Sequence, residues 1–222
     1  MRSPLFNMRM AIQMLEQLLI KSAQSSVPLD QPQIDFRSET YLQILRDECE
    51  YGMTLLNNLF DLQQLDKSTP KTEDLILLQD WIRQVSAPFI ERAQQRQQTF
   101  KIQIDADLPP LLSNVASLRR ILTELLHNAC KYTPFGETIV VSAEMTLDRV
   151  YLRVSNSGVE ISAEEAEHIF DKFYQISNSD RWTQSSMGLG LAIVKQLVMQ
   201  LNGTIQVKSA AGWTRFTVKL PF

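Results

Sequence analysis

Two glycines with one residue between them stand directly before an apolar segment of helical periodicity. Gly188, Leu189 and Gly190 close a polar loop, and apolar residues then recur at helical spacing over 191–201. Glycine lets the backbone come close to a ligand, and the first N–H groups of a helix face an anion. The pattern indicates a phosphate site, although two glycines before a helix more often form only a turn.

A second segment carries three polar side chains at helical spacing. Glu124, Asn128 and Lys131 follow one another at intervals of four and three residues, so a helix presents all three on one face. An amide oxygen can be one of the few protein ligands of a nucleotide-bound Mg²⁺, and a lysine can meet a phosphate as a point charge. Taken alone, however, this triplet is more typical of a solvated helix face.

Two further segments lie between these and complete the set. Asn156-Ser157-Gly158 directly follows a predicted strand, and Phe170 and Phe173 stand just before the polar loop 175–187. By themselves the two phenylalanines predict ordinary core aromatics. Their order relative to the other segments carries the information.

In order and spacing, the four segments resemble the asparagine, first glycine, phenylalanine and second glycine boxes of sensor histidine kinases. The resemblance covers nearly the whole chain. It implies a transferase of a two-component system, a protein histidine kinase with ATP and Mg²⁺ as cofactors. Its ATP-binding domain would have the fold also seen in gyrase and the Hsp90-type chaperones. The γ-phosphate would pass to a histidine and then, in a phosphorelay, to an aspartate of a response regulator.

The resemblance implies roles for the residues of the asparagine box. Asn128 would bind Mg²⁺, Lys131 would contact phosphate, and Tyr132 would lie near the nucleotide. Glu124 would orient the attacking group. Because transfer to a histidine nitrogen needs chiefly positioning and charge neutralisation, Glu124 need only be a polariser.

The same resemblance assigns the glycine segment. Gly188, Leu189 and Gly190 would cradle the phosphates, and residues 175–187 would form a mobile lid over the nucleotide. Within that lid, residues 178–182 look like those of cyanobacterial and plastid sensor kinases.

The first glycine box departs from the family's usual Asp-x-Gly-x-Gly. Asn156 replaces the aspartate that accepts a hydrogen bond from the adenine amino group, Gly158 is retained, and Glu160 replaces the second glycine. An amide oxygen accepts that bond without the charge-assisted component, a difference of roughly 1 kcal/mol. Glu160 would be unfavourable for phosphate if it pointed inward. We expect weakened but retained ATP binding.

The N-terminus resembles the end of the family's phosphoacceptor motif, His-Asp/Glu-x-Arg-Ser/Thr-Pro-Leu. Met1-Arg2-Ser3-Pro4-Leu5 aligns with its last five positions, which places the acceptor histidine two residues before Met1. The only histidines, His127 and His168, lie in the nucleotide domain, at positions more typical of solvent-facing helix residues than of a phosphoacceptor. We therefore expect a chain truncated after its acceptor histidine that does not phosphorylate itself.

Residues 1–66 predict a helical hairpin. Apolar residues recur every three or four positions in two stretches, 5–19 and 42–59, and Pro28 and Pro32 mark the connection between them. A lone hairpin cannot cover its apolar stripe, so the sequence favours a homodimer through a four-helix bundle. The alternative is that the hairpin packs on the rest of the same chain.

Residues 67–222 predict an α/β sandwich, so that the whole chain is of the α+β class. The periodicity favours helices over 80–96, 117–132, 164–174 and 191–201, and strands over 75–78, 99–105, 138–145, 150–155, 203–209 and 214–220. The last two strands would form a hairpin turned around Gly212. The linker between the two domains would be 67–71.

Composition excludes several classes of protein. The chain has 222 residues, a net charge of -3 and no long run of lysine or arginine, so nucleic acid is an unexpected partner. No apolar stretch is long enough to span a bilayer, and no signal-peptide pattern is visible, which favours a cytoplasmic protein. Cys49 and Cys130 form no metal or redox motif and predict buried free thiols.

Two other functions remain open at this point. A non-catalytic signalling scaffold would explain Asn156 and Glu160 as signs of a degenerate pocket, but it would leave Asn128, Lys131 and the glycines without a reason. An ATPase of the same fold would use Glu124 as the general base for water. The phosphoacceptor-like Arg2-Ser3-Pro4-Leu5 argues against that second alternative.

Overall fold

The computed structural model describes residues 10–17, 40–46, 49, 52, 74–176 and 188–222. The chain divides into two compact units, Met1–Phe60 and Asp61–Phe222. In the first unit, residues 10–17 and 40–46 are helical, as the predicted hairpin requires. The connection between them and the phosphoacceptor-like residues 1–5 lie outside the described residues, so the hairpin stays a prediction. Cys49 is exposed and only Cys130 is buried, so the prediction of two buried thiols is wrong for Cys49.

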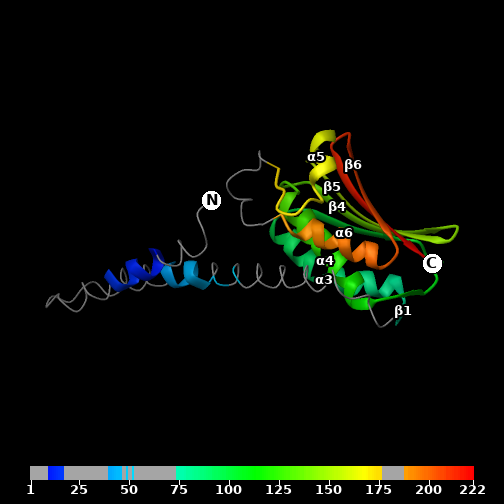
Figure 1. Cartoon of the computed structure of the whole chain (residues 1–222), viewed down its shortest axis with the longest axis horizontal. Helices are drawn as coiled ribbons and strands as arrows, with labels where there is room; N and C mark the ends of the chain where they lie inside the picture. The colour runs from blue at the N-terminus through cyan, green and yellow to red at the C-terminus, as the bar shows by residue number, and fades with distance from the viewer. Residues whose placement is uncertain (1–9, 18–39, 47–48, 50–51, 53–73, 177–187) are drawn as a thin grey trace. The chain divides into compact units, whose positions relative to one another are not determined.

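A five-stranded sheet organises the second unit (Figure 1). In spatial order its strands are β2 (Thr99–Ile104), β4 (Thr138–Thr146), β5 (Arg149–Ser157), β7 (Trp213–Pro221) and β6 (Thr204–Ala210). β2 is parallel to β4, and all other neighbours are antiparallel. Two short strands form a separate antiparallel pair: β1 (Asp74–Ile76), which precedes α3, and β3 (Leu111–Ser113), which follows β2. The sequence did not predict β3, because three residues after two prolines carry no readable period.

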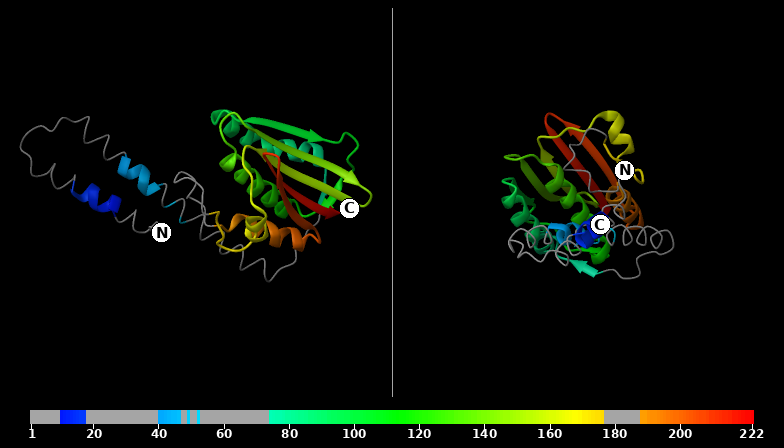
Figure 2. Two further views of the ribbon diagram at one scale, coloured as in Figure 1. Left: turned by 90° about the horizontal axis from the view of Figure 1, so that it is seen from above. Right: turned by 90° about the vertical axis from the view of Figure 1, so that its left-hand side faces the viewer.

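Three helices cover one face of the sheet, as the two further views in Figure 2 also show. They are α3 (Leu78–Gln95), α4 (Val115–Tyr132) and α6 (Gly190–Gln200). On β5 the side chains of Val150, Leu152 and Val154 belong to the core shared with these helices. Because strand side chains alternate, the residues between them face the other side of the sheet. The fold is therefore the predicted α+β sandwich, with one covered and one open sheet face.

The α4 helix has a side-chain cap that fixes where it begins. The Asn114 side-chain oxygen accepts a hydrogen bond from the Ser117 N–H at 2.8 Å. This places the first helical residue at Val115, two positions before the predicted start. Seven buried residues, Leu118, Ile121, Leu122, Leu125, Leu126, Ala129 and Cys130, anchor one side of α4 in the core. The opposite side remains available to polar residues.

The helix predicted over 164–174 is shorter than expected. The helix α5 spans only Ala163–His168, opened by a capping box between Ser162 and Glu165. The chain then turns, and Phe173 has a φ of 68°, which no helix allows. The Phe173 N–H instead donates to the carbonyl of Gly188 at 3.0 Å, so a tertiary contact overrides the local helical pattern.

Candidate functional site

The polar face of α4 carries the predicted asparagine-box residues together. Glu124, Asn128 and Lys131 are each partly buried, whereas the intervening Leu125, Leu126 and Ala129 are fully in the core. Arg120, one turn before Glu124, places its guanidinium 3.0 Å from the Glu124 carboxylate. Sequence reasoning missed Arg120, although its i, i+4 spacing to Glu124 could have indicated the pair.

The N-terminus of α6 lies directly against this face of α4. A β-carbon placed on Gly190 would stand 2.7 Å from Oε2 of Glu124, so only a residue without a side chain leaves that carboxylate undisturbed. Leu189, the N-cap residue, is buried and offers no side-chain cap to the helix. The N-cap residue thus contributes no side-chain acceptor to the first N–H groups of α6, which stand at the end of the helix that attracts anions.

Gly188 holds the turn that brings α6 to this position. Its φ is 65°, and a β-carbon there would lie 2.2 Å from the backbone oxygen of Tyr174. The Gly188 carbonyl accepts the hydrogen bond from Phe173, which ties the second glycine box to the phenylalanine box. The glycine is required here by both its dihedral angle and the close backbone approach.

Asn156 lies inside β5, not after the strand as predicted. The strand continues to Ser157 because β7 pairs with it as far as Trp213. Alternation places Asn156 on the covered face with Val154, and the residue is 5% exposed. Among the described residues, none forms a hydrogen bond with the Asn156 side chain. A buried amide without a protein partner is suited to a ligand that supplies one.

Gly158 joins the first glycine box to the end of α4. With a φ of 83°, it packs so closely on the turn after α4 that a β-carbon would lie 2.7 Å from Cγ of Glu137 and 2.9 Å from Cδ of Pro134. Next to it, the Ser157 hydroxyl accepts from the Thr138 N–H at 2.9 Å and contacts the Glu137 carboxylate. These contacts fix Asn156 relative to the helix that carries Asn128.

Glu160 is tied to the turn between β6 and β7. Its carboxylate accepts a hydrogen bond from the N–H of Gly212, in the turn between β6 and β7. The neighbouring Gly158 N–H donates to the Gly212 carbonyl at 2.8 Å, and Thr214 Oγ1 donates to the Val159 carbonyl at 2.8 Å. Glu160 thus links its own loop to the β6–β7 hairpin. Repulsion of phosphate was expected only if this carboxylate pointed inward, and here it is engaged by a backbone N–H.

Lys131 and Tyr132 are the last two residues of α4 and continue its polar end. The Lys131 ammonium stands 5.2 Å from the centre of the Tyr132 ring, and burial lowers the pKa of Lys131 from its usual value. Tyr132 is one of the exposed large side chains of the domain. A partly desolvated cation beside an exposed ring can interact with a phosphate and a base at the same time.

The two histidines have local explanations. His127 lies exposed on α4 with its ring 5.1 Å from that of Phe89, edge to face, and partial burial together with Arg92 and Arg120 lowers its pKa. His168 ends α5, exposed, with Nδ1 2.9 Å from the Asp171 carboxylate. Both positions agree with the expectation of solvent-facing helix residues.

The donor set suits a metal that arrives with a nucleotide. In the part of the chain that the structure describes, no group of three or more His, Cys, Asp or Glu side chains could hold a metal ion. Mg²⁺ keeps several waters and is commonly bound by one or two protein oxygens plus substrate phosphates. The Asn128 amide, one turn from Glu124, fits that requirement. Most of the expected lid, residues 177–187, lies outside the described residues.

Comparison with known proteins identifies the domain. Residues 113–222 match the family described as "Histidine kinase-, DNA gyrase B-, and HSP90-like ATPase". The sensor histidine kinase CusS of Escherichia coli is 32% identical over 199 residues, which cover 89% of this chain and 41% of CusS. The chain thus spans less than half the length of that relative.

Two solved structures share the fold. Full-length ShkA in complex with AMPPNP has a TM-score of 0.73 at 20% identity, covering 99% of this chain and 46% of ShkA. Histidine kinase ThkA in complex with response regulator protein TrrA has a TM-score of 0.69 at 19% identity, covering 96% of this chain and 58% of that one. Within the described residues, no helix is long and apolar enough to cross a membrane. The chain belongs to the histidine kinase-, DNA gyrase B- and HSP90-like ATPase family, and its ATPase domain is of the sensor histidine kinase type.

Proposed function

We propose that this chain is the catalytic core of a two-component sensor histidine kinase. In the reaction, an imidazole nitrogen of a histidine forms a bond to the γ-phosphorus of ATP. The bond from that phosphorus to the β–γ bridging oxygen breaks, and ADP leaves. The phosphoryl group then passes to an aspartate of a response regulator. The kinase relatives, of which the chain spans less than half the length, support this proposal.

The observation that carries the proposal is the approach of Gly190 to Glu124. A β-carbon on Gly190 would lie 2.7 Å from Oε2 of Glu124, so the start of α6 lies at the polar face of α4. Phosphates at the N–H groups of α6 would then lie beside Asn128 and Lys131. Glu124, held by Arg120, would polarise the attacking group.

Magnesium would be held at Asn128 together with the nucleotide. When bound, the ion would neutralise charge on the transferring phosphoryl group. Lys131 would add a second positive charge from the same helix face. The remaining work of the protein is to orient the phosphates and exclude water.

The adenine end of the site would be formed by Asn156. Its buried amide can accept from the adenine amino group, without the charge of the usual aspartate. Because Glu160 is held by Gly212, the second departure costs the pocket little. Weakened but retained ATP binding remains our expectation, and binding of that kind, once measured, would favour a kinase over a degenerate scaffold.

The partners follow from the same assignment. ShkA is described with bound AMPPNP and ThkA with the response regulator TrrA, and by likeness this chain would bind ATP and a receiver domain. Residues 1–66 would form the homodimer through a four-helix bundle, and 67–222 would be the ATP-binding domain working in the cytoplasm. Neither His127 nor His168 would serve as the phosphoacceptor.

The first test measures Mg-ATP binding by titration calorimetry. Asn128→Ala should lower the affinity by about tenfold or more, because a first ligand of the ion is removed. Gln206→Ala, an exposed amide on the open sheet face, is the matched control and should bind like the parent chain. Absence of Mg-ATP binding at millimolar nucleotide would contradict the proposal.

A second measurement separates transfer from hydrolysis. Incubated with γ-labelled ATP, the chain itself should stay unlabelled, whereas a chain extended upstream by a histidine two positions before Met1 should acquire acid-labile, base-stable phosphate. Steady release of phosphate without any acceptor, abolished by Glu124→Gln, would instead identify an ATPase.

A further inference from the structure

The sheet face that the helices leave open is strongly basic. Its strand positions carry the cations Lys101, Arg149, Arg153, Lys208, Arg215 and Lys219, and among these described strands Glu144 is the single carboxylate on that face. The chain as a whole has a net charge of -3. The positive charge is therefore concentrated by the fold and is not a result of composition.

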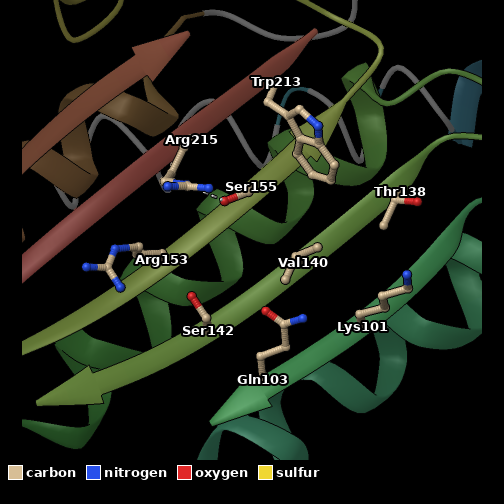
Figure 3. Close-up of a pocket in the computed structure, with 9 residues that line it drawn as sticks. All are labelled: Lys101, Gln103, Thr138, Val140, Ser142, Arg153, Ser155, Trp213 and Arg215. Carbon is tan, nitrogen blue, oxygen red and sulfur yellow. Dashed lines mark hydrogen bonds between the residues drawn. The ribbon is translucent and has the colours of Figure 1, made fainter. Parts of the chain in front are cut away.

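A cavity of about 480 Å³ opens on this face (Figure 3). It is formed by four adjacent strands, and its lining consists of Lys101, Gln103, Thr138, Val140, Ser142, Arg153, Ser155, Trp213 and Arg215. The volume lies in the range of sites for small molecules. A flat surface patch would fit an extended macromolecule better than this half-open hollow does.

The hollow arises from the sizes of neighbouring side chains. Two short side chains, Ser142 on β4 and Ser155 on β5, form the middle of the hollow. Longer side chains stand around them: Lys101 on β2, Arg153 on β5 and Arg215 on β7. Trp213 closes one end of the group in Figure 3. Cations and hydroxyls dominate this lining, so its chemistry suits a ligand rich in acceptor oxygens.

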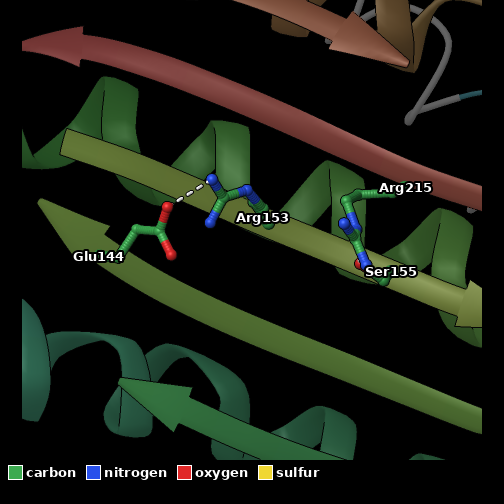
Figure 4. Close-up of polar contacts among 4 residues, drawn as sticks. All are labelled: Glu144, Arg153, Ser155 and Arg215. Atoms are coloured by element: carbon green, nitrogen blue, oxygen red, sulfur yellow. Dashed lines mark hydrogen bonds and ion pairs between the residues drawn. The ribbon is translucent and has the colours of Figure 1, made fainter. Parts of the chain in front are cut away.

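The cations in the cavity are incompletely balanced by protein groups. Arg153 contacts the Glu144 carboxylate at 2.6 Å, whereas Nε of Arg215 donates to the neutral Ser155 hydroxyl at 3.2 Å (Figure 4). The hydrogen bond from Arg153, together with the charges of both arginines, lowers the pKa of Glu144, so a single carboxylate serves two guanidinium groups. Lys208 stands directly opposite Arg215 across the β6–β7 ladder. Like charges in such a pair destabilise a sheet, and an anion between or beside them would remove that cost.

We propose that this cavity binds a phosphate-bearing small molecule. The two arginines would grip the phosphate oxygens, Lys101 would add charge from the opposite side, and the serine hydroxyls would donate from the floor. Trp213 offers a flat surface for any ring that the ligand carries. The occupant is a free small molecule, because the volume of about 480 Å³ matches a site of that size.

This site is separate from the proposed nucleotide site. Consecutive residues of β5 point to opposite faces, so Ser155 belongs to the cavity and Asn156 to the covered face. The sheet itself stands between the two positions. A variant in one site can therefore be used as a control for the other.

Calorimetric titration of the full chain with inorganic pyrophosphate tests the proposal. The double variant Arg153→Gln/Arg215→Gln should lose at least about tenfold in affinity, because two charge-assisted contacts are removed. Arg149→Gln removes the same kind of charge from this face outside the cavity, and it should change the affinity by less than about twofold, since exposed charges act weakly at a distance. Circular dichroism and thermal unfolding of each variant establish that it is folded; if the double variant is not, Lys101→Gln provides the same comparison.

Four outcomes would overturn the proposal. They are no binding of pyrophosphate at millimolar concentration, an equal loss in Arg149→Gln, and binding that Asn128→Ala abolishes while the cavity variants retain it. The fourth is binding of poly-glutamate or of anionic phospholipid vesicles without binding of pyrophosphate, which would assign this face to an acidic segment or a membrane.

Discussion

At the scale of single residues, the two glycines of the second glycine box have different roles. Gly188 is required by a positive φ and by the backbone oxygen of Tyr174. At Gly190, the neighbour within the described residues that a β-carbon would meet is the end of the Glu124 side chain, which can move. The first glycine therefore serves the fold, and the second keeps a carboxylate in place beside the phosphate position.

Alanine substitutions at these two positions should differ in their effect on the free energy of unfolding. Gly188→Ala should lower the free energy of unfolding by about 2 kcal/mol, because the left-handed backbone and the close carbonyl cannot both be relieved. Gly190→Ala should change it by less than about 0.5 kcal/mol, since alanine is favourable in a helix and Glu124 can rotate away. Urea titrations followed by circular dichroism measure both values. Equal losses would contradict this division of roles.

At the scale of elements, α4 is the helix on which the candidate site depends. One side is buried in the core, the other carries Glu124, Asn128 and Lys131, and its start is set by the Asn114 cap. The position of the cap determines where along the sheet each polar residue stands. Stability of this first turn is thus coupled to the geometry of the site.

Removal of the cap should weaken the domain measurably. Asn114→Ala should reduce the free energy of unfolding by about 1 kcal/mol, because the Ser117 N–H loses its acceptor. Asn114→Ser keeps an acceptor oxygen and should recover most of that loss. Thermal unfolding at matched concentration compares the three chains. If Asn114→Ser loses as much stability as Asn114→Ala, the missing cap is not the cause of the loss.

At the scale of the whole molecule, the described helical residues of the first unit carry exposed apolar side chains. Met10, Ile12 and Met14 are exposed on the helical residues 10–17, and Leu42 and Ile44 are exposed on 40–46. Exposed apolar side chains on short helices are typical of surfaces that a second copy covers. This supports the proposed four-helix bundle.

Dimerisation can be tested with neighbouring substitutions on one helix. Sedimentation velocity should find the parent chain as a dimer at micromolar concentration. Ile12→Glu should shift it to monomer, because Ile12 is 46% exposed in the single chain and would bury a charge in the bundle. Gln13→Glu adds the same charge to an adjacent polar position and should leave the dimer intact. A monomeric parent chain would refute the homodimer.

Periodic features were readable from the sequence because they are local. The period of α4 placed Glu124, Asn128 and Lys131 on one face, and the alternation in β2 placed Phe100, Ile102 and Ile104 on the face that packs on the core. Segments decided by distant contacts were not readable. The helix predicted over 164–174 ends early because Phe173 bonds to Gly188, and β5 extends to Ser157 because β7 continues to pair with it.

By itself, the sequence determined the α+β class, the order of the four boxes and the residues available for a nucleotide. Only the tertiary structure decided that Glu160 is held by Gly212, that Glu124 stands against Gly190, and that scattered lysines and arginines form one basic sheet face. The physical reason is that side-chain period is set within a segment. The direction of a side chain and the charge density of a surface, in contrast, depend on neighbours that the fold brings together from far apart in the sequence.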